Sequence, residues 1–366
     1  MRFLLTLIFS LILVYSATKA NADAQLNAPQ YYEIVDLLTT ELHTPQLEQW
    51  LKEQSLTNEQ ALVVEAIKSY KAEELQQGVD SLSGILANTQ LPEAHYWAGR
   101  LFGQQASEAS MFKAGGLAES ALLHFKRSVE LDPHFLDGHI ALVQYYIRAP
   151  FFAGGSVKKA RLSADDIAKL NPIEGILAHI QIAGSEEDNK ALTRYTKDLT
   201  VALNREVENS NSEYDNSQIA NYFFSAAMTQ LQAEEFALSG ENLRQALDFS
   251  EQSAAQFTAL SESEKKSILS TVKHSNLVNL QQAIRYQIGR LGVVSEQNID
   301  VSIIALNDFL AGPKHPTFES HWAKLRLAQL LQMDGQLAKA KDFVKQLPDI
   351  DNDQFKKLKK KLLKKL

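Results

Sequence analysis

Apolar residues recur at intervals of three and four along most of the chain, as at Leu47, Trp50 and Leu51 and again at Ala328 and Leu331. This spacing gives a helix of 3.6 residues per turn one continuous apolar face. No segment alternates between apolar and polar residues for long enough to indicate a strand. Glycine and proline, which interrupt helices, number only 16 and 9. The pattern therefore predicts an all-α fold.

Two segments share one arrangement of small and bulky residues. In each, a small residue is followed at four, seven and twelve positions by two residues of the same helix face and then by proline: Ala121, Phe125, Ser128 and Pro133, and Ala160, Ala164, Ile167 and Pro172. A small residue lets a neighbouring helix approach closely, and proline ends the helix. The spacing predicts helices that pack in a repeated way.

This arrangement resembles the second helix of the tetratricopeptide repeat (TPR), a unit of two helices. Other segments carry parts of the same pattern: Ala328, Gly335 and Ala340; Gly289, Val301, Ala305 and Pro313; and, less completely, Ala227, Ser239, Leu243 and Ala246, and Ala66, Gly78 and Leu82. Two units carry insertions, one before Ala121 and one around Gly154. The resemblance implies a right-handed solenoid of helix-turn-helix repeats, whose concave face binds a protein or peptide.

The motif Y-x-x-G-R-L occurs twice, beginning at Tyr96 and at Tyr286. Repeat duplication explains two distant copies, and shared composition is the alternative. The TPR resemblance implies that six residues of the first helices face the groove: Tyr96, Arg100, Gln144, Arg148, Tyr286 and Arg290. Arginine offers a fork for carboxylates and tyrosine a broad contact area. The tyrosines could instead be structural, because the same helices pack on their neighbours.

The glycine pair Gly154-Gly155 is followed by Ser156 and, after Val157, by two lysines. We expect a helix to end at Arg148 and the next to begin at Val157, with Ser156 as its N-cap. The spacing differs from G-x-x-x-x-G-K-[ST], which argues against nucleotide binding. Two hypotheses remain: a packed loop, or an anion or partner carboxylate held by the backbone. The residues concerned are Phe151, Phe152, Gly154, Gly155, Ser156 and Lys158. The order of proline, glycine pair and lysine-alanine here resembles a segment of exported TPR proteins, including accessory components of tripartite (TRAP-type) transporters.

Residues 1–22 combine an early arginine, an apolar run from Phe3 to Tyr15 and the small-x-small ending Ala20-Asn21-Ala22. These are the marks of a cleaved secretory signal peptide. The chain contains no cysteine, so an exported protein of this length must fold without disulfides, which favours a bacterial periplasm.

Charge is distributed unevenly along the sequence. The formal net charge is −7, yet residues 356–366 hold seven lysines and no acid. Without Arg2, Lys19 and these lysines, residues 23–355 carry −16. So acidic a body argues against nucleic acid as a partner. The lysine-rich segment predicts a basic amphipathic helix, which either caps the solenoid or contacts an anionic membrane peripherally.

Candidate catalytic and metal sites are weak. The nine histidines form no H-E-x-x-H motif, and His134 and His139 are spaced poorly for a shared metal. Asp349, Asp351 and Asp353 imitate the opening of a calcium loop, but the required glycine and closing glutamate are absent. The sequence therefore predicts no catalytic residue, no metal and no cofactor.

These observations predict a non-catalytic scaffold of the cell envelope that binds a protein or peptide partner. A small-ligand or transporter-accessory protein is the first alternative and an enzyme the second. The predicted segments are a signal peptide (1–22), N-terminal helices (23–90), a TPR-like core (91–175), degenerate repeats with loops at 184–190 and 205–218 (176–260), C-terminal TPR-like repeats (261–348) and a basic tail helix (349–366).

Overall fold

The computed structural model describes residues 35, 38, 45–53, 56–209, 212 and 214–366. Within these residues every element is a helix, which confirms the predicted all-α class. The predicted signal peptide lies outside the described residues. None of the described helices is long and apolar enough to cross a membrane. The chain forms two compact units that divide between Ala202 and Leu203, inside one helix.

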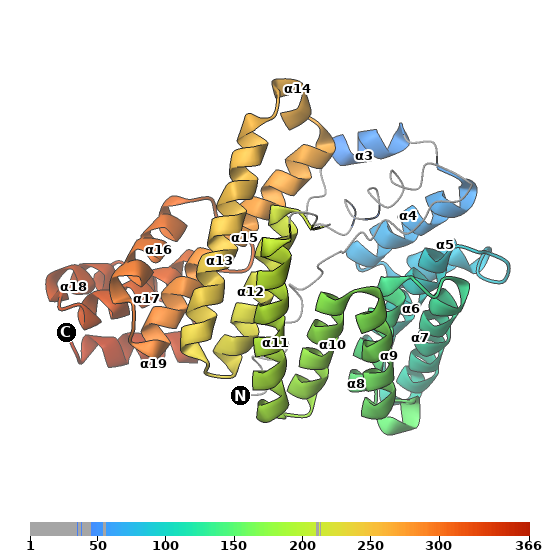
Figure 1. The fold of residues 1–366 in the computed structure, drawn as a ribbon, viewed down its shortest axis with the longest axis horizontal. Helices are drawn as coiled ribbons and strands as arrows, with labels where there is room; N and C mark the ends of the chain where they lie inside the picture. Colours follow the sequence, from blue (N-terminus) through green and yellow to red (C-terminus); the bar gives the residue numbers. More distant parts are fainter. Residues whose placement is uncertain (1–34, 36–37, 39–44, 54–55, 210–211, 213) are drawn as a thin grey trace. The chain divides into compact units, whose positions relative to one another are not determined.

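The N-terminal unit consists of helices that pack on their sequence neighbours. The helices, coloured blue to green in Figure 1, are α3 (Pro45–Lys52), α4 (Asn58–Lys71), α5 (Leu75–Ser83), α6 (Pro92–Glu108), α7 (Met111–Leu131), α8 (Leu136–Arg148), the 3-10 turn η1 (Phe151–Ala153), α9 (Val157–Leu170), α10 (Pro172–Ser185) and α11 (Asn189–Glu208), which continues past the division. The pairs α4/α5, α6/α7 and α8/α9 pack on each other, and each second helix contacts the next pair.

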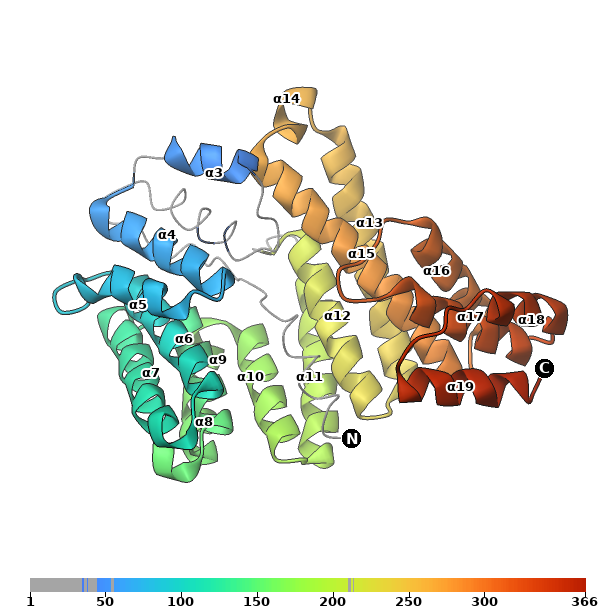
Figure 2. The same cartoon turned by 180° about the vertical axis from the view of Figure 1, so that it is seen from behind.

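The C-terminal unit is built in the same way. Its helices, seen from the other side in Figure 2, are α12 (Asn216–Gln232), α13 (Phe236–Ala259), α14 (Glu262–Lys265), α15 (Ile268–Ser295), α16 (Ile299–Ala311), α17 (Ser320–Met333), α18 (Leu337–Lys345) and α19 (Asp353–Leu363). The pairs are α12/α13, α15/α16 and α17/α18. The paired arrangement accords with helix-turn-helix units in both parts of the chain.

Small residues lie where paired helices meet. Ala121, Ala160 and Ala340, which the repeated pattern singled out, are fully buried. The glycine of each Y-x-x-G-R-L copy has the same role. A Cβ on Gly99 would lie 2.5 Å from the Phe125 ring of α7, and one on Gly289 would lie 2.2 Å from Leu306 of α16. These helix pairs approach so closely that no larger side chain fits at the contact.

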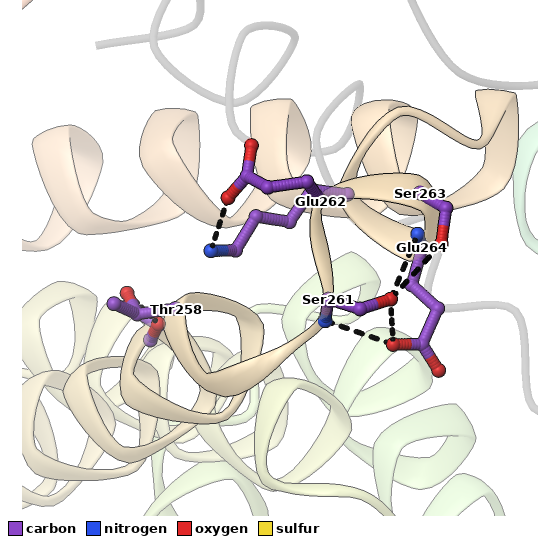
Figure 3. Close-up of polar contacts among 7 residues, drawn as sticks. Thr258, Ser261, Glu262, Ser263 and Glu264 are labelled. Atoms are coloured by element: carbon purple, nitrogen blue, oxygen red, sulfur yellow. Dashed lines mark hydrogen bonds and ion pairs between the residues drawn. The ribbon is translucent and has the colours of Figure 1, made fainter.

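Helix starts follow the capping signals in the sequence. Ser156 accepts a hydrogen bond from the Lys159 amide at 3.3 Å, which confirms it as the N-cap of α9. At the start of α14, Ser261 and Glu264 form a reciprocal capping box (Figure 3). The Ser261 amide donates to Glu264 Oε2 at 2.8 Å, and the Glu264 amide donates back to Ser261 Oγ at 3.3 Å. Two amides that no helical carbonyl can reach are thereby satisfied.

The insertion before Ala121 lies within long helices, since α6 and α7 have 17 and 21 residues. The predicted loops at 184–190 and 205–218 are shorter than expected, since α10 ends at Ser185, α11 runs from Asn189 to Glu208 and α12 begins at Asn216. Polar residues at these positions occupy the exposed faces of helix ends, a pattern that composition alone does not distinguish from a loop.

The lysine-rich tail forms α19 and closes the end of the C-terminal unit. Phe355 and Leu362 are 1% and 3% exposed and pack with Leu325, Val344 and Leu347. The apolar face predicted from the sequence therefore packs on the other helices of the same unit. This contact supports the capping alternative and leaves only the lysine face of α19 for any external contact.

The close contact at Gly99 yields a test with a matched control. Gly99→Ala and Gly115→Ala each gain helix propensity, but a Cβ on Gly115 in α7 would meet nothing within 4 Å. Because the Phe125 ring must move in the first variant only, we expect it to be about 1–3 kcal/mol less stable than the second in urea unfolding. Equal stabilities would contradict the packing at this contact.

Candidate functional site

The first Y-x-x-G-R-L copy lies on α6, and its tyrosine belongs to the core. Tyr96 is 7% exposed, and its ring meets those of Trp97 at 5.5 Å and Phe135 at 5.7 Å, both edge to face. Its hydroxyl accepts a hydrogen bond from Arg100 Nη1 at 2.8 Å. The expectation that Tyr96 lines an open groove is therefore wrong. The residue packs the core and holds the arginine that follows it by one helical turn.

Arg100 is half-buried and surrounded by aromatic rings. Its guanidinium lies 5.0 Å from the Tyr70 ring centroid and 5.3 Å from that of Trp97. Nη2 donates to the Tyr70 hydroxyl at 3.2 Å. Stacking on rings and bonding to neutral hydroxyls fix the position of the guanidinium but leave its charge unneutralised.

A second arginine, the exposed Arg148 at the end of α8, interacts electrostatically with Arg100. Desolvation by the surrounding protein and the charge of Arg100 lower the pKa of Arg148. Within the described part of the chain, no carboxylate forms an ion pair with either arginine. The two like charges repel each other, solvent weakens this repulsion at the exposed Arg148, and a bound anion would relieve what remains.

The second motif copy, on α15, repeats this arrangement. Tyr286 is 6% exposed and stacks on Phe318 with a centroid distance of 4.5 Å. Its hydroxyl accepts from Arg326 Nε of α17 at 3.2 Å, and the Arg326 guanidinium lies 5.4 Å from the ring centroid. Burial and the charge of Arg326 lower the pKa of Arg290. Tyr286, like Tyr96, is thus a core residue that anchors an arginine.

We call Arg100 with Arg148, and Arg290 with Arg326, the two arginine pairs. In both, one arginine follows the motif glycine and the other comes from a helix of the next pair. The two pairs differ in which arginine is hydrogen-bonded to the motif tyrosine. Tyr96 accepts from Arg100, which belongs to the motif, whereas Tyr286 accepts from Arg326, which does not. Among the described residues neither Arg290 nor Arg326 forms an ion pair either. The duplication of the motif is therefore a duplication of a local site.

Five of the six predicted groove residues lie at these sites, and two further residues of the sites were not predicted. Tyr70 and Arg326 were not selected, although Arg326 lies on the first helix of the last repeat-like unit. Because groove residues were expected on first helices, this position could have identified Arg326 from the sequence. Gln144 is half-buried one turn before Arg148 on α8, and no hydrogen bond joins it to the arginine pair. The structure thus gives Gln144 no defined part in the site.

The loop before α9 lacks the free amides that an anion site would need. The amides of Gly154, Gly155 and Ser156 donate to the carbonyls of Phe151, Pro150 and Tyr146, respectively, at 3.0, 3.1 and 2.9 Å. A Cβ on Gly155 would lie 1.8 Å from the Ala149 carbonyl oxygen, so the glycine permits the tight turn. The structure therefore contradicts the backbone-anion hypothesis and supports a packed loop.

This packed loop nevertheless presents two aromatic side chains to solvent. Phe151 and Phe152 are 92% and 81% exposed, while Tyr145 fixes the loop by donating from its hydroxyl to the Ala153 carbonyl at 2.6 Å. Lys158 is exposed on the first turn of α9. The packed-loop hypothesis therefore holds for the loop backbone but is wrong for these two phenylalanine side chains. Exposed aromatics on a fixed loop are typical of contact surfaces.

Two features of the described residues bear on metal and solute binding. Within that part of the chain, no group of three or more histidine, aspartate or glutamate side chains is placed to hold a metal ion. A depression of about 550 Å³ lies between the start of α5 and the end of α6, lined by Glu73, Glu74, Leu75, Gln76, Gln77, Gln105, Glu108 and Ala109. It is open to solvent, and six of its eight lining residues are glutamate or glutamine, whereas a solute site is expected to be enclosed.

Two histidines that the sequence did not single out, one on α6 and one on α7, form a hydrogen bond with each other. His95 Nδ1 lies 2.9 Å from His124 Nδ1, and His124 stacks on Phe102. Burial, His124 and Arg127 lower the pKa of His95 to about 4, whereas Glu130 acts in the opposite direction. Burial also lowers the pKa of His124. One imidazole donates and the other accepts, so protonation of both would break the contact.

Comparison with known proteins assigns no family: no protein-family model matches the chain, and no curated protein matches it significantly.

The histidine contact predicts a specific pH dependence of stability. Because the folded-state pKa of His95 is below the unfolded value, the unfolded chain binds the additional proton, and stability falls as pH decreases from about 6.5 to 4. We expect His95→Gln to remove on the order of 1–2 kcal/mol of that fall, measured by urea unfolding at pH 7 and pH 4.5. The exposed His134→Gln serves as the control and should leave the fall unchanged. An identical pH dependence in both variants would contradict the assignment.

Proposed function

We propose that the chain is a non-catalytic helical-repeat scaffold that binds acidic segments of a protein partner at its two arginine pairs. The observation that carries the proposal is the absence of ion-pair partners for Arg100, Arg148, Arg290 and Arg326 among the described residues. The chain contains 44 acidic residues against 37 basic ones, so carboxylates are not scarce. Both arginine pairs nevertheless lack a carboxylate partner among the described residues.

The chemistry of arginine favours carboxylates as the ligand. A guanidinium presents parallel N–H donors that match the two oxygens of a carboxylate, and such charge-assisted bonds are stronger than neutral ones. Tyr96 and Tyr286 already fix one arginine of each pair. Less conformational entropy is then lost when the partner binds. The repulsion within each pair adds to the preference for an anion.

The surrounding architecture supports a scaffold. Paired helices with small residues at their contacts are typical of TPR-like solenoids, which offer extended surfaces to protein segments. We infer that both units belong to such a right-handed array. Residues 1–22 predict export, and the lack of cysteine favours the bacterial periplasm as the location that we propose. The exposed Phe151 and Phe152 provide a further contact surface for the same partner.

A fluorescein-labelled hexaglutamate peptide provides a direct test. We expect the full chain to bind it at low ionic strength, and Arg148→Gln and Arg290→Gln each to weaken binding about tenfold, since each removes a charge-assisted bond. Fluorescence anisotropy measures this affinity. Thermal unfolding of Arg148→Gln should be unchanged or shifted upward, because the substitution also removes a like-charge repulsion.

The matched control is Arg161→Gln, which makes the same charge change at an exposed arginine paired with Glu186. It should leave hexaglutamate affinity unchanged. Equal weakening by all three substitutions would mean that net charge alone attracts the peptide. Loss of stability in Arg148→Gln without loss of binding would mean that the arginine is structural. Either result would refute the proposed function.

A further inference from the structure

The outward face of α19 carries a stripe of lysines that the packing of the helix leaves free. Lys357, Lys360, Lys361 and Lys364 stand at intervals of three, one and three residues, directly opposite the buried Phe355 and Leu362. All four are exposed. We call these four residues the lysine stripe.

Two other lysines of the tail, Lys356 and Lys359, contact the protein, whereas the stripe does not. Lys356 pairs with Asp351 at 2.7 Å, and Lys359 donates to the Leu347 carbonyl at 3.2 Å. Within the described residues, no ion pair or hydrogen bond joins a stripe lysine to an acceptor side chain. The stripe is therefore a concentration of unneutralised positive charge at the end of an otherwise acidic chain.

We propose that the lysine stripe docks the protein on an anionic lipid bilayer surface. A helix whose apolar face is held by its own protein presents its charges as a fixed row, which suits a flat anionic surface. Leu363, 54% exposed beside the stripe, adds an apolar contact at the headgroup level. This mode differs from insertion of an amphipathic helix, because Phe355 and Leu362 stay in the core.

Charge screening explains how an acidic body tolerates such a surface. At about 0.1 M salt the screening length is about 10 Å, so acidic groups more than one helix diameter away repel the bilayer weakly. Lysines near the surface each add attraction independently. The exposed Leu363 gains from contact with lipid but not from contact with a phosphate backbone, so a lipid surface is favoured over nucleic acid.

The test is co-sedimentation of the full chain with vesicles of phosphatidylcholine alone or mixed with phosphatidylglycerol. We expect partition onto the anionic vesicles to exceed that onto neutral ones by about 100-fold at 0.1 M salt and to be largely lost at 1 M salt. The neutral vesicles report any apolar binding by other parts of the chain, including residues 1–22. Equal partition onto both vesicles would overturn the proposal.

Two fourfold variants locate the effect. Replacement of the stripe lysines by glutamine should reduce anionic partition about 100-fold while circular dichroism stays unchanged. The control replaces Lys190, Lys197, Lys273 and Lys314, four exposed lysines on other segments, and should retain binding. Equal losses in both variants would show that only net charge matters and would overturn the proposal.

Light scattering without vesicles addresses the second copy of the chain as an alternative occupant. Concentration-dependent association that the stripe variant abolishes would assign the stripe to the acidic body of a second copy and overturn the lipid proposal. Tighter binding of a short DNA duplex than of anionic vesicles would do the same in favour of nucleic acid. The hexaglutamate assay addresses different residues, so failure here leaves the proposed function intact.

Discussion

The close contact between paired helices at alanine and glycine is the constraint on which the structure depends. Where the second helix of a pair meets the first, Phe125 lies on Gly99 and Leu306 lies on Gly289. Any side chain at these glycines would separate the helices and disturb the burial of residues around them. Because burial of apolar area is the main source of stability in a chain without disulfides, the small residues determine which helices can pair.

This constraint also explains why the two candidate sites are alike. In Y-x-x-G-R-L, the tyrosine and leucine enter the core, the glycine forms the contact, and the arginine follows immediately. The contact therefore sets where the guanidinium emerges. A neighbouring pair of helices then supplies the second arginine, Arg148 or Arg326. A packing motif and a charge site are thus carried by the same six residues.

Much of the fold could be predicted from the sequence, because periodicity, small residues and caps act locally. The burial of Ala121 and the capping of Ser156 follow from spacing and side-chain chemistry alone. The burial of Tyr96 could not be predicted, since a tyrosine suits a core and a groove equally well. The partners of Arg100 and Arg326 depend on which helices meet, and the loop amides at Gly155 depend on the fold of the turn. Contacts distant in sequence leave no periodic signal.

A crystal structure of the chain grown with hexaglutamate tests the central claim most directly. The account predicts a peptide carboxylate between Arg100 and Arg148, at charge-assisted hydrogen-bond distances of about 2.7–2.9 Å, and a second one between Arg290 and Arg326. Both tyrosines should remain buried with their hydroxyls bonded to arginine. Arginines paired instead with carboxylates of the chain itself, with the peptide absent from both sites, would contradict it.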